Sequence, residues 1–152
     1  MSSGIKIYKI KDFIRRTESG EIDFDKSIQM VRELSLAAYF HKDHNILIDL
    51  RETTVSIAGV EKLMKIAMEF VECMPSFKNK IANVIPRNPN RVAVAKKFEE
   101  CMNINKYQYK FFTEYEDAIE WLSDVISWNK LPLKLYLDAD VLKTPPAGYA
   151  NR

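Results

Sequence analysis

The sequence predicts an α/β fold: a mostly parallel sheet of about five strands with an N-terminal antiparallel hairpin, about four helices and an extended C-terminal tail. Residues 46–51 (ILIDLR) form a nearly continuous apolar run, which is typical of a strand covered on both faces. A polar stretch and a long amphipathic segment follow at once, so a strand end meets a helix start. Strand-like and helix-like segments then alternate, and this alternation favours parallel pairing with right-handed crossovers.

The N-terminal hairpin is predicted from alternating apolar and polar residues. Residues 5–10 (IKIYKI) have the period-two pattern of a half-buried strand. Residues 11–12 are expected to turn the chain, and residues 13–18 to return as a second strand. Ser19 and Gly20 are expected to end that strand, because such residues commonly interrupt regular structure.

The remaining elements follow from periodicity and from capping residues. Apolar residues at helical spacing predict four helices, with Asp23, Asn88 and Thr113 as caps of the first, third and last. The second is expected to start near Ser56 and to stop before Pro75. The predicted helices span residues 24–40, 56–74, 88–102 and 113–126, and the strands between them span residues 46–50, 80–86 and 107–111.

The composition is that of an ordinary globular protein. The chain has 152 residues, 47% hydrophobic and 29% charged, which fits one domain over residues 1–128 followed by a tail over residues 129–152. The formal net charge of +2 is too small to indicate a nucleic-acid-binding face. No apolar run approaches the roughly 18 residues of a membrane span. Cys73 and Cys101 lie on apolar helical faces and are interpreted as reduced core thiols, which favours a cytoplasmic protein.

The tail has a strongly apolar face. Four leucines alternate with polar or constrained residues, namely Leu131, Leu133, Leu135 and Leu137. At roughly 25 cal/mol per Å² of apolar area, several kcal/mol favour covering this face. It is expected to lie over the protein's own surface or over a second subunit, and we favour the contact in a homodimer.

The segment between the predicted strand at residues 80–86 and the third helix is the best candidate for an anion-binding site. Arg87, Asn88, Asn90 and Arg91 surround a predicted helix amino terminus, where free N–H groups and the helix dipole attract anions. Guanidinium groups suit phosphate or carboxylate. A plain capped helix with exposed arginines is an equally good interpretation.

A second polar cluster follows the apolar strand at residues 46–50. Asp49, Arg51 and Glu52 form either an acid–base set or a structural ion pair, and we favour the ion pair because Arg51 shares the face of Asp49. The hydroxyl residues beyond them, Thr53, Thr54 and Ser56, are expected to cap the second helix.

The two histidines give a weaker signal. His41 and His44 are three residues apart, a spacing that brings two imidazoles together on a helical turn. Zinc sites usually have four clearly spaced ligands. A solvated loop is therefore the favoured interpretation, and neither a metal nor a cofactor is expected.

Four short segments resemble a known family. They are residues 19–23 (SGEID), 46–51 (ILIDLR), 111–113 (FFT) and 117–122 (DAIEWL). On these segments the chain, over roughly residues 5–123, resembles the STAS-like family of SpoIIAA-like proteins, which are related in fold to anti-sigma-factor antagonists. That resemblance implies a phosphorylatable serine after the central strand. The matching residues 56–59 (SIAG) keep the glycine and replace the hydroxyl positions with Ile57 and Ala58.

Some members of the family are similar to lipid-transfer folds of the CRAL-TRIO type, which implies an apolar or lipid-like ligand. The favoured hypothesis is therefore a non-catalytic, cytoplasmic STAS-like module that acts through protein contacts as a homodimer. The alternative is a carrier or sensor of an anionic or lipid-like small ligand, with Arg87 and Arg91 at its head group. A third hypothesis is an enzyme that uses Asp49, Arg51 and Glu52.

Overall fold

The computed structural model describes residues 6–9, 12–57 and 59–127, and it divides the chain into two units. The larger unit spans residues 10–123, and the smaller one combines residues 1–9 with residues 124–152. The predicted α/β fold with a parallel sheet and four helices is confirmed. The tail leucines Leu131, Leu133, Leu135 and Leu137 lie outside the described residues.

The larger unit is a four-stranded parallel sheet in the order β2-β3-β4-β5. Each strand is followed by a helix, and the strands lie side by side in the order in which they occur in the sequence. The elements are β2 (Phe13–Ile22), α1 (Phe24–Phe40), β3 (Asn45–Val55), α2 (Val60–Cys73), β4 (Lys80–Val84), α3 (Pro89–Ile104), β5 (Gln108–Phe112) and α4 (Tyr115–Leu122).

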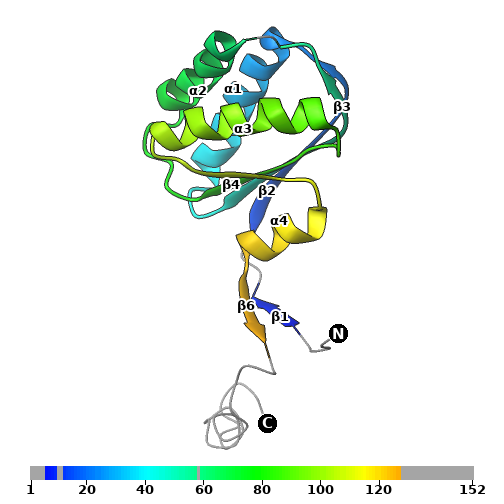
Figure 1. The fold of residues 1–152 in the computed structure, drawn as a ribbon. Helices are drawn as coiled ribbons and strands as arrows, with labels where there is room; N and C mark the ends of the chain where they lie inside the picture. Colours follow the sequence, from blue (N-terminus) through cyan, green and yellow to red (C-terminus); the bar gives the residue numbers. More distant parts are fainter. Residues whose placement is uncertain (1–5, 10–11, 58, 128–152) are drawn as a thin grey trace, which may run out of the picture. The chain divides into compact units, whose positions relative to one another are not determined.

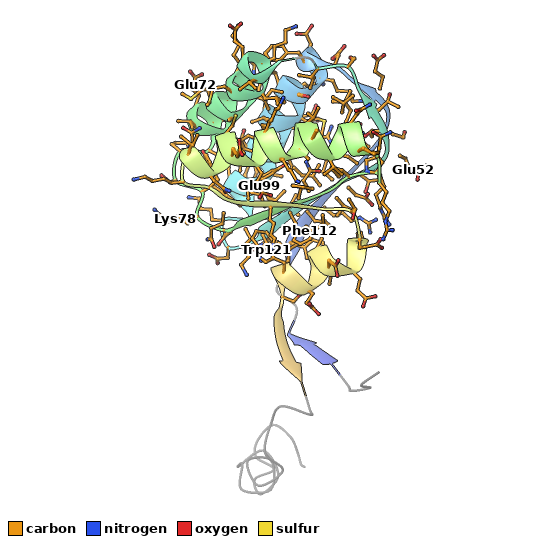
Figure 2. All side chains as sticks on the ribbon, in the orientation of Figure 1. Glu52, Glu72, Lys78, Glu99, Phe112 and Trp121 are labelled. Atoms are coloured by element: carbon orange, nitrogen blue, oxygen red, sulfur yellow. The ribbon has the colours of Figure 1, made fainter. Side chains whose placement is uncertain are left out.

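The helices cover the two faces of this sheet unequally. Figure 1 shows α1, α2 and α3 on one side of the sheet and α4 on the other. Ile46 and Ile48 of β3 pack in the core of the three-helix side, whereas Leu47 packs under α4. On the α4 side, the rings of Phe112 and Trp121 lie 5.8 Å apart (Figure 2). Both faces of β3 are thus covered, which explains its continuous apolar sequence.

The predicted antiparallel hairpin is wrong. β2 pairs in parallel with β3, and β1 (Lys6–Lys9) instead pairs antiparallel with β6 (Asp124–Ser127) in a separate two-stranded sheet. The main sheet therefore has four strands and not five. Alternating apolar and polar residues indicate that a segment is a strand, but they do not indicate which strand it pairs with. Here α1 returns the chain so that β3 runs beside β2 in the same direction, which makes the pairing parallel.

The predicted end of β2 and both predicted ends of the last helix are also wrong. β2 continues through Ser19 and Gly20 to Ile22, and Gly20 has φ +84°, a conformation that suits glycine. The last predicted helix ends at Leu122, because residues 124–127 extend to pair with β1. Its N-cap residue is Glu114 and not Thr113.

One irregularity in β3 determines where the site forms. Thr17 of β2 pairs with Asp49, and Ser19 pairs with Glu52, so β3 has one residue more than β2 across this interval. Such a bulge reverses the alternation of side chains beyond it. Ile48 faces the three-helix side before the bulge, and Val55 faces it afterwards.

The second helix starts later than predicted. β3 extends to Val55, and α2 begins at Val60 after the N-cap residue Gly59, whose φ of +87° again suits glycine. Thr53 and Thr54 therefore belong to the strand and do not cap α2.

Of the free cysteines, Cys101 is buried and Cys73 is partly buried. Among the described residues, no helix combines the length and apolarity needed to cross a bilayer.

Candidate functional site

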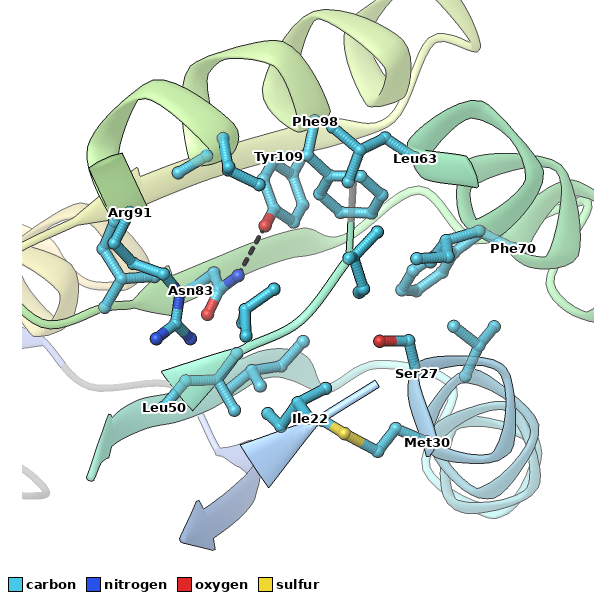
Figure 3. A pocket seen from close by; sticks show the side chains of 18 of the residues that line it. Ile22, Ser27, Met30, Leu50, Leu63, Phe70, Asn83, Arg91, Phe98 and Tyr109 are labelled. Carbon is cyan, nitrogen blue, oxygen red and sulfur yellow. Dashed lines mark hydrogen bonds between the residues drawn. The ribbon is translucent and has the colours of Figure 1, made fainter. Parts of the chain in front are cut away.

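An apolar cavity of about 100 Å³ lies between the sheet and the three helices α1, α2 and α3. Every one of these elements contributes apolar side chains to its wall. The lining includes Ile22, Leu50 and Val55 from the strands, Met30 and Leu34 from α1, Leu63 and Phe70 from α2, and Val94 and Phe98 from α3. A close view shows that Arg91, Asn83 and Tyr109 gather at one end of the cavity (Figure 3). The cavity thus has a mostly apolar body, with one charged and polar end at Arg91, Asn83 and Tyr109 and the Ser27 hydroxyl elsewhere in its wall.

Arg91 supplies the positive charge at this end. It lies in the first turn of α3, where its backbone N–H donates to the N-cap Asn88 Oδ1 at 3.1 Å. Its partly buried guanidinium has no carboxylate within salt-bridge distance among the described residues. Burial lowers the pKa of Arg91, although an arginine remains protonated in proteins. The polar end of the cavity therefore holds a partly desolvated cation that has no anionic partner in the described part of the chain.

Thr53, which follows the bulge in β3, holds this cation in place. Thr53 is buried, and both its backbone oxygen and its Oγ1 accept hydrogen bonds from the Arg91 guanidinium at 2.8 Å. The Thr53 hydroxyl itself donates to Leu50 O at 2.7 Å. Of the five N–H donors of Arg91, two bind Thr53 and the others have no partner among the described residues. Thr53 thus acts as a positioning residue for the guanidinium.

Asn83 and Tyr109 form the other polar group. The Asn83 amide nitrogen donates to the Tyr109 hydroxyl at 2.7 Å, and the Tyr109 ring packs edge-on against Phe98 with centroids 5.2 Å apart. Burial raises the pKa of Tyr109, so the phenol stays protonated. The Asn83 Oδ1 atom is buried and has no hydrogen-bond partner among the described residues.

The structure separates the residues of the predicted anion site. Asn88 is the N-cap of α3, and its Oδ1 accepts from the backbone N–H groups of Asn90 and Arg91. Arg87 is exposed and forms a salt bridge with Glu114. Only Arg91 lines the cavity, so the two arginines do not converge on one ligand position as the sequence predicts.

Of the predicted strand-end cluster, Asp49 and Arg51 lie on the opposite face of the sheet, whereas Thr53 lies on the cavity side beside Arg91. Asp49 and Arg51 form a bidentate ion pair with atoms 2.9 and 2.8 Å apart, and the hydrogen bonds from Arg51 lower the pKa of Asp49. The Arg51 guanidinium lies 4.8 Å from the ring centre of Tyr115, next to α4. Glu52 is exposed at the edge of the molecule and does not join them (Figure 2). The structure shows the ion pair that the two-residue spacing indicates.

The other predicted positions do not approach the cavity. Thr54 and Ser56 are exposed, and the Ser56 backbone N–H donates to Ile22 O at 3.0 Å. The imidazole rings of His41 and His44 lie 4.9 Å apart in the loop after α1. Across the described segments, no three His, Cys, Asp or Glu side chains are grouped so that they could hold a metal ion.

The sequence contains signals that distinguish Arg91 from Arg87 and that point to Asn83, which the prediction missed. Arg91 lies one helical turn before Ala95 and two turns before Phe98, so it falls on the apolar stripe of α3. Asn83 alternates with Ile81 and Ile85 and is therefore a polar residue on an apolar strand face. Both exceptions to the apolar pattern point into the cavity.

Comparison with known proteins identifies one similar fold. No protein-family model matches the chain, and no curated protein matches it. A crystal structure of an uncharacterized protein of the DUF3478 family, with a SpoIIAA-like fold, from Shewanella loihica PV-4, is similar to it. The two are 20% identical with a TM-score of 0.47, over 80% of this chain and 98% of the other.

Proposed function

We propose that this domain binds a small molecule that has an apolar body and an anionic group. The observation that carries the proposal is the partly buried Arg91 guanidinium, which has no carboxylate partner among the described residues and lies at the end of an apolar cavity. A buried charge is unfavourable unless it is paired. An anionic ligand supplies the missing partner, and the apolar wall removes the rest of the ligand from water.

The cavity volume limits the size of the ligand. About 100 Å³ is smaller than the range of roughly 300–1,000 Å³ that is usual for drug-sized ligands. It is closer to the engineered cavity of about 150 Å³ that binds benzene in another protein. The apolar body is therefore one ring or a short branched chain, whereas a long acyl chain exceeds the space.

The position of the cavity supports binding rather than catalysis by the predicted acid–base set. The side chains of Asp49 and Arg51 lie on the face of the sheet that α4 covers, whereas the cavity lies on the face that α1, α2 and α3 cover. The cavity is also close to the carboxyl end of the parallel strands and the start of α3, where α/β folds commonly bind ligands. The expected homodimer depends on Leu131, Leu133, Leu135 and Leu137, which lie outside the described residues, and the ligand proposal does not require it.

Calorimetric titration with phenylacetate and with 3-methylbutanoate tests the proposal. We expect both acids to bind the wild type, and Arg91→Met to weaken binding by about tenfold or more, because a hydrogen bond to a charged group contributes about 1.5–3 kcal/mol. Arg87→Met is the matched control: it removes the same charge beside the same helix start, outside the cavity. Absence of binding to the wild type, or an equal loss in both variants, contradicts the proposal.

A further inference from the structure

The unpaired Asn83 oxygen gives information about the ligand that Arg91 alone does not give. Buried polar atoms in native proteins nearly always have a hydrogen-bond partner. Asn83 Oδ1 has none among the described residues, and the residue lines the cavity beside the Arg91 side chain (Figure 3). The site therefore offers a hydrogen-bond acceptor as well as a cation.

The neighbours of Asn83 keep its oxygen directed at the cavity. The other end of the amide is held by the Tyr109 hydroxyl at 2.7 Å. A half-turn of the amide would direct its NH₂ group to the end of the cavity that already carries the Arg91 cation. The oxygen is the negative end of the amide dipole, and a nearby cation favours it there.

A ligand that satisfies both groups must accept from Arg91 and donate to Asn83. A carboxylate beside an arginine remains ionised, and in that state it only accepts hydrogen bonds. The donor must therefore come from a second group of the ligand. An ammonium group would bring a second positive charge next to Arg91 and is unfavourable. A hydroxyl group donates without adding charge.

We propose that the cavity selects a small hydroxy acid. Its carboxylate binds Arg91, its neighbouring hydroxyl donates to Asn83 Oδ1, and its ring or branched chain occupies the apolar part of the cavity. This inference rests on the proposed function and adds the chemical class of the ligand.

Matched pairs of acids test the inference in the full chain. Mandelate is compared with phenylacetate, and 2-hydroxy-3-methylbutanoate with 3-methylbutanoate, using both enantiomers of each hydroxy acid in calorimetric titrations. We expect one enantiomer of a hydroxy acid to bind about tenfold more tightly than its parent acid, because a buried acceptor left unpaired penalises the analogue that lacks the hydroxyl.

Three variants assign that preference to the amide. Asn83→Leu is expected to abolish the preference while phenylacetate still binds. Tyr109→Phe removes the hydroxyl that holds the Asn83 amide, so the NH₂ group can turn towards the ligand carboxylate. We expect this variant to reduce the preference for the hydroxy acid. It keeps the test valid if Asn83→Leu does not fold. Ser27→Ala is the control. The Ser27 hydroxyl lines the cavity, but it already donates a hydrogen bond to Asp23 O at 3.0 Å. We expect this variant to prefer the hydroxy acid over its parent acid as strongly as the wild type does.

The outcomes distinguish this inference from the proposed function. If no acid of either pair binds the wild type, the proposed function is wrong and the inference falls with it. If acids bind but hydroxylated and parent acids bind equally, or if both Asn83→Leu and Tyr109→Phe keep the full preference, only the inference is overturned.

Discussion

Replacing Thr53 by valine tests whether the hydroxyl of Thr53 positions Arg91. Valine keeps the shape and the β-branch of threonine and removes only the hydroxyl, which lies 2.8 Å from the Arg91 guanidinium and 2.7 Å from Leu50 O. A hydrogen bond to a charged group contributes about 1.5–3 kcal/mol. Arg91 keeps its bond to the Thr53 backbone oxygen, so we expect the free energy of unfolding to fall by about 1.5–3 kcal/mol.

Urea unfolding followed by circular dichroism measures this change. For a urea m-value of roughly 1–3 kcal/mol/M, the midpoint should decrease by on the order of 1 M with an unchanged slope. Thr54→Val is the matched control, because Thr54 is the next residue of the strand and is exposed, so its effect should stay within about 0.5 kcal/mol. The double variant with Arg91→Met should show a coupling of about 1–2 kcal/mol. Equal effects of the two threonine substitutions, or additive effects in the double variant, would refute the positioning role of Thr53.

Two further predictions concern the polar residues around the sheet. Hydrogen bonds from Arg51 lower the pKa of Asp49 in the folded protein. The ionised carboxylate therefore stabilises the fold fully at pH values above its pKa in the unfolded chain, about 3.9. This stabilisation is lost as the pH falls through the lower pKa of the folded protein. Asp49→Asn should therefore be about 1–3 kcal/mol less stable near neutral pH and approach the wild type below about pH 4; a constant difference in acid titrations contradicts this. Asn88→Ala should cost about 1 kcal/mol in urea unfolding through loss of the α3 cap, whereas Asn90→Ala should cost little; equal costs argue against the cap.

The candidate site was only partly predictable from the sequence. The pattern around Asn88 correctly locates a helix start with its N-cap. It assigns Arg87 and Arg91 to one ligand, whereas Arg87 pairs with Glu114 and Arg91 lines the cavity. Residue spacing places both arginines near the same helix end and does not state which one meets the apolar layer. Helical periodicity within α3 distinguishes them, since only Arg91 shares the stripe of Phe98.

The sequence by itself determined most of the local structure of the larger unit. Caps at Asp23 and Asn88, apolar stripes on the helices and the buried run at residues 46–50 follow from neighbouring residues, because capping and periodicity are local effects. Only the tertiary structure decided that β2 pairs in parallel with β3 and that β3 contains a bulge. Both depend on contacts between residues distant in the chain. The bulge is what turns Thr53 toward Arg91, and so the cation at the end of the cavity is a consequence of strand pairing.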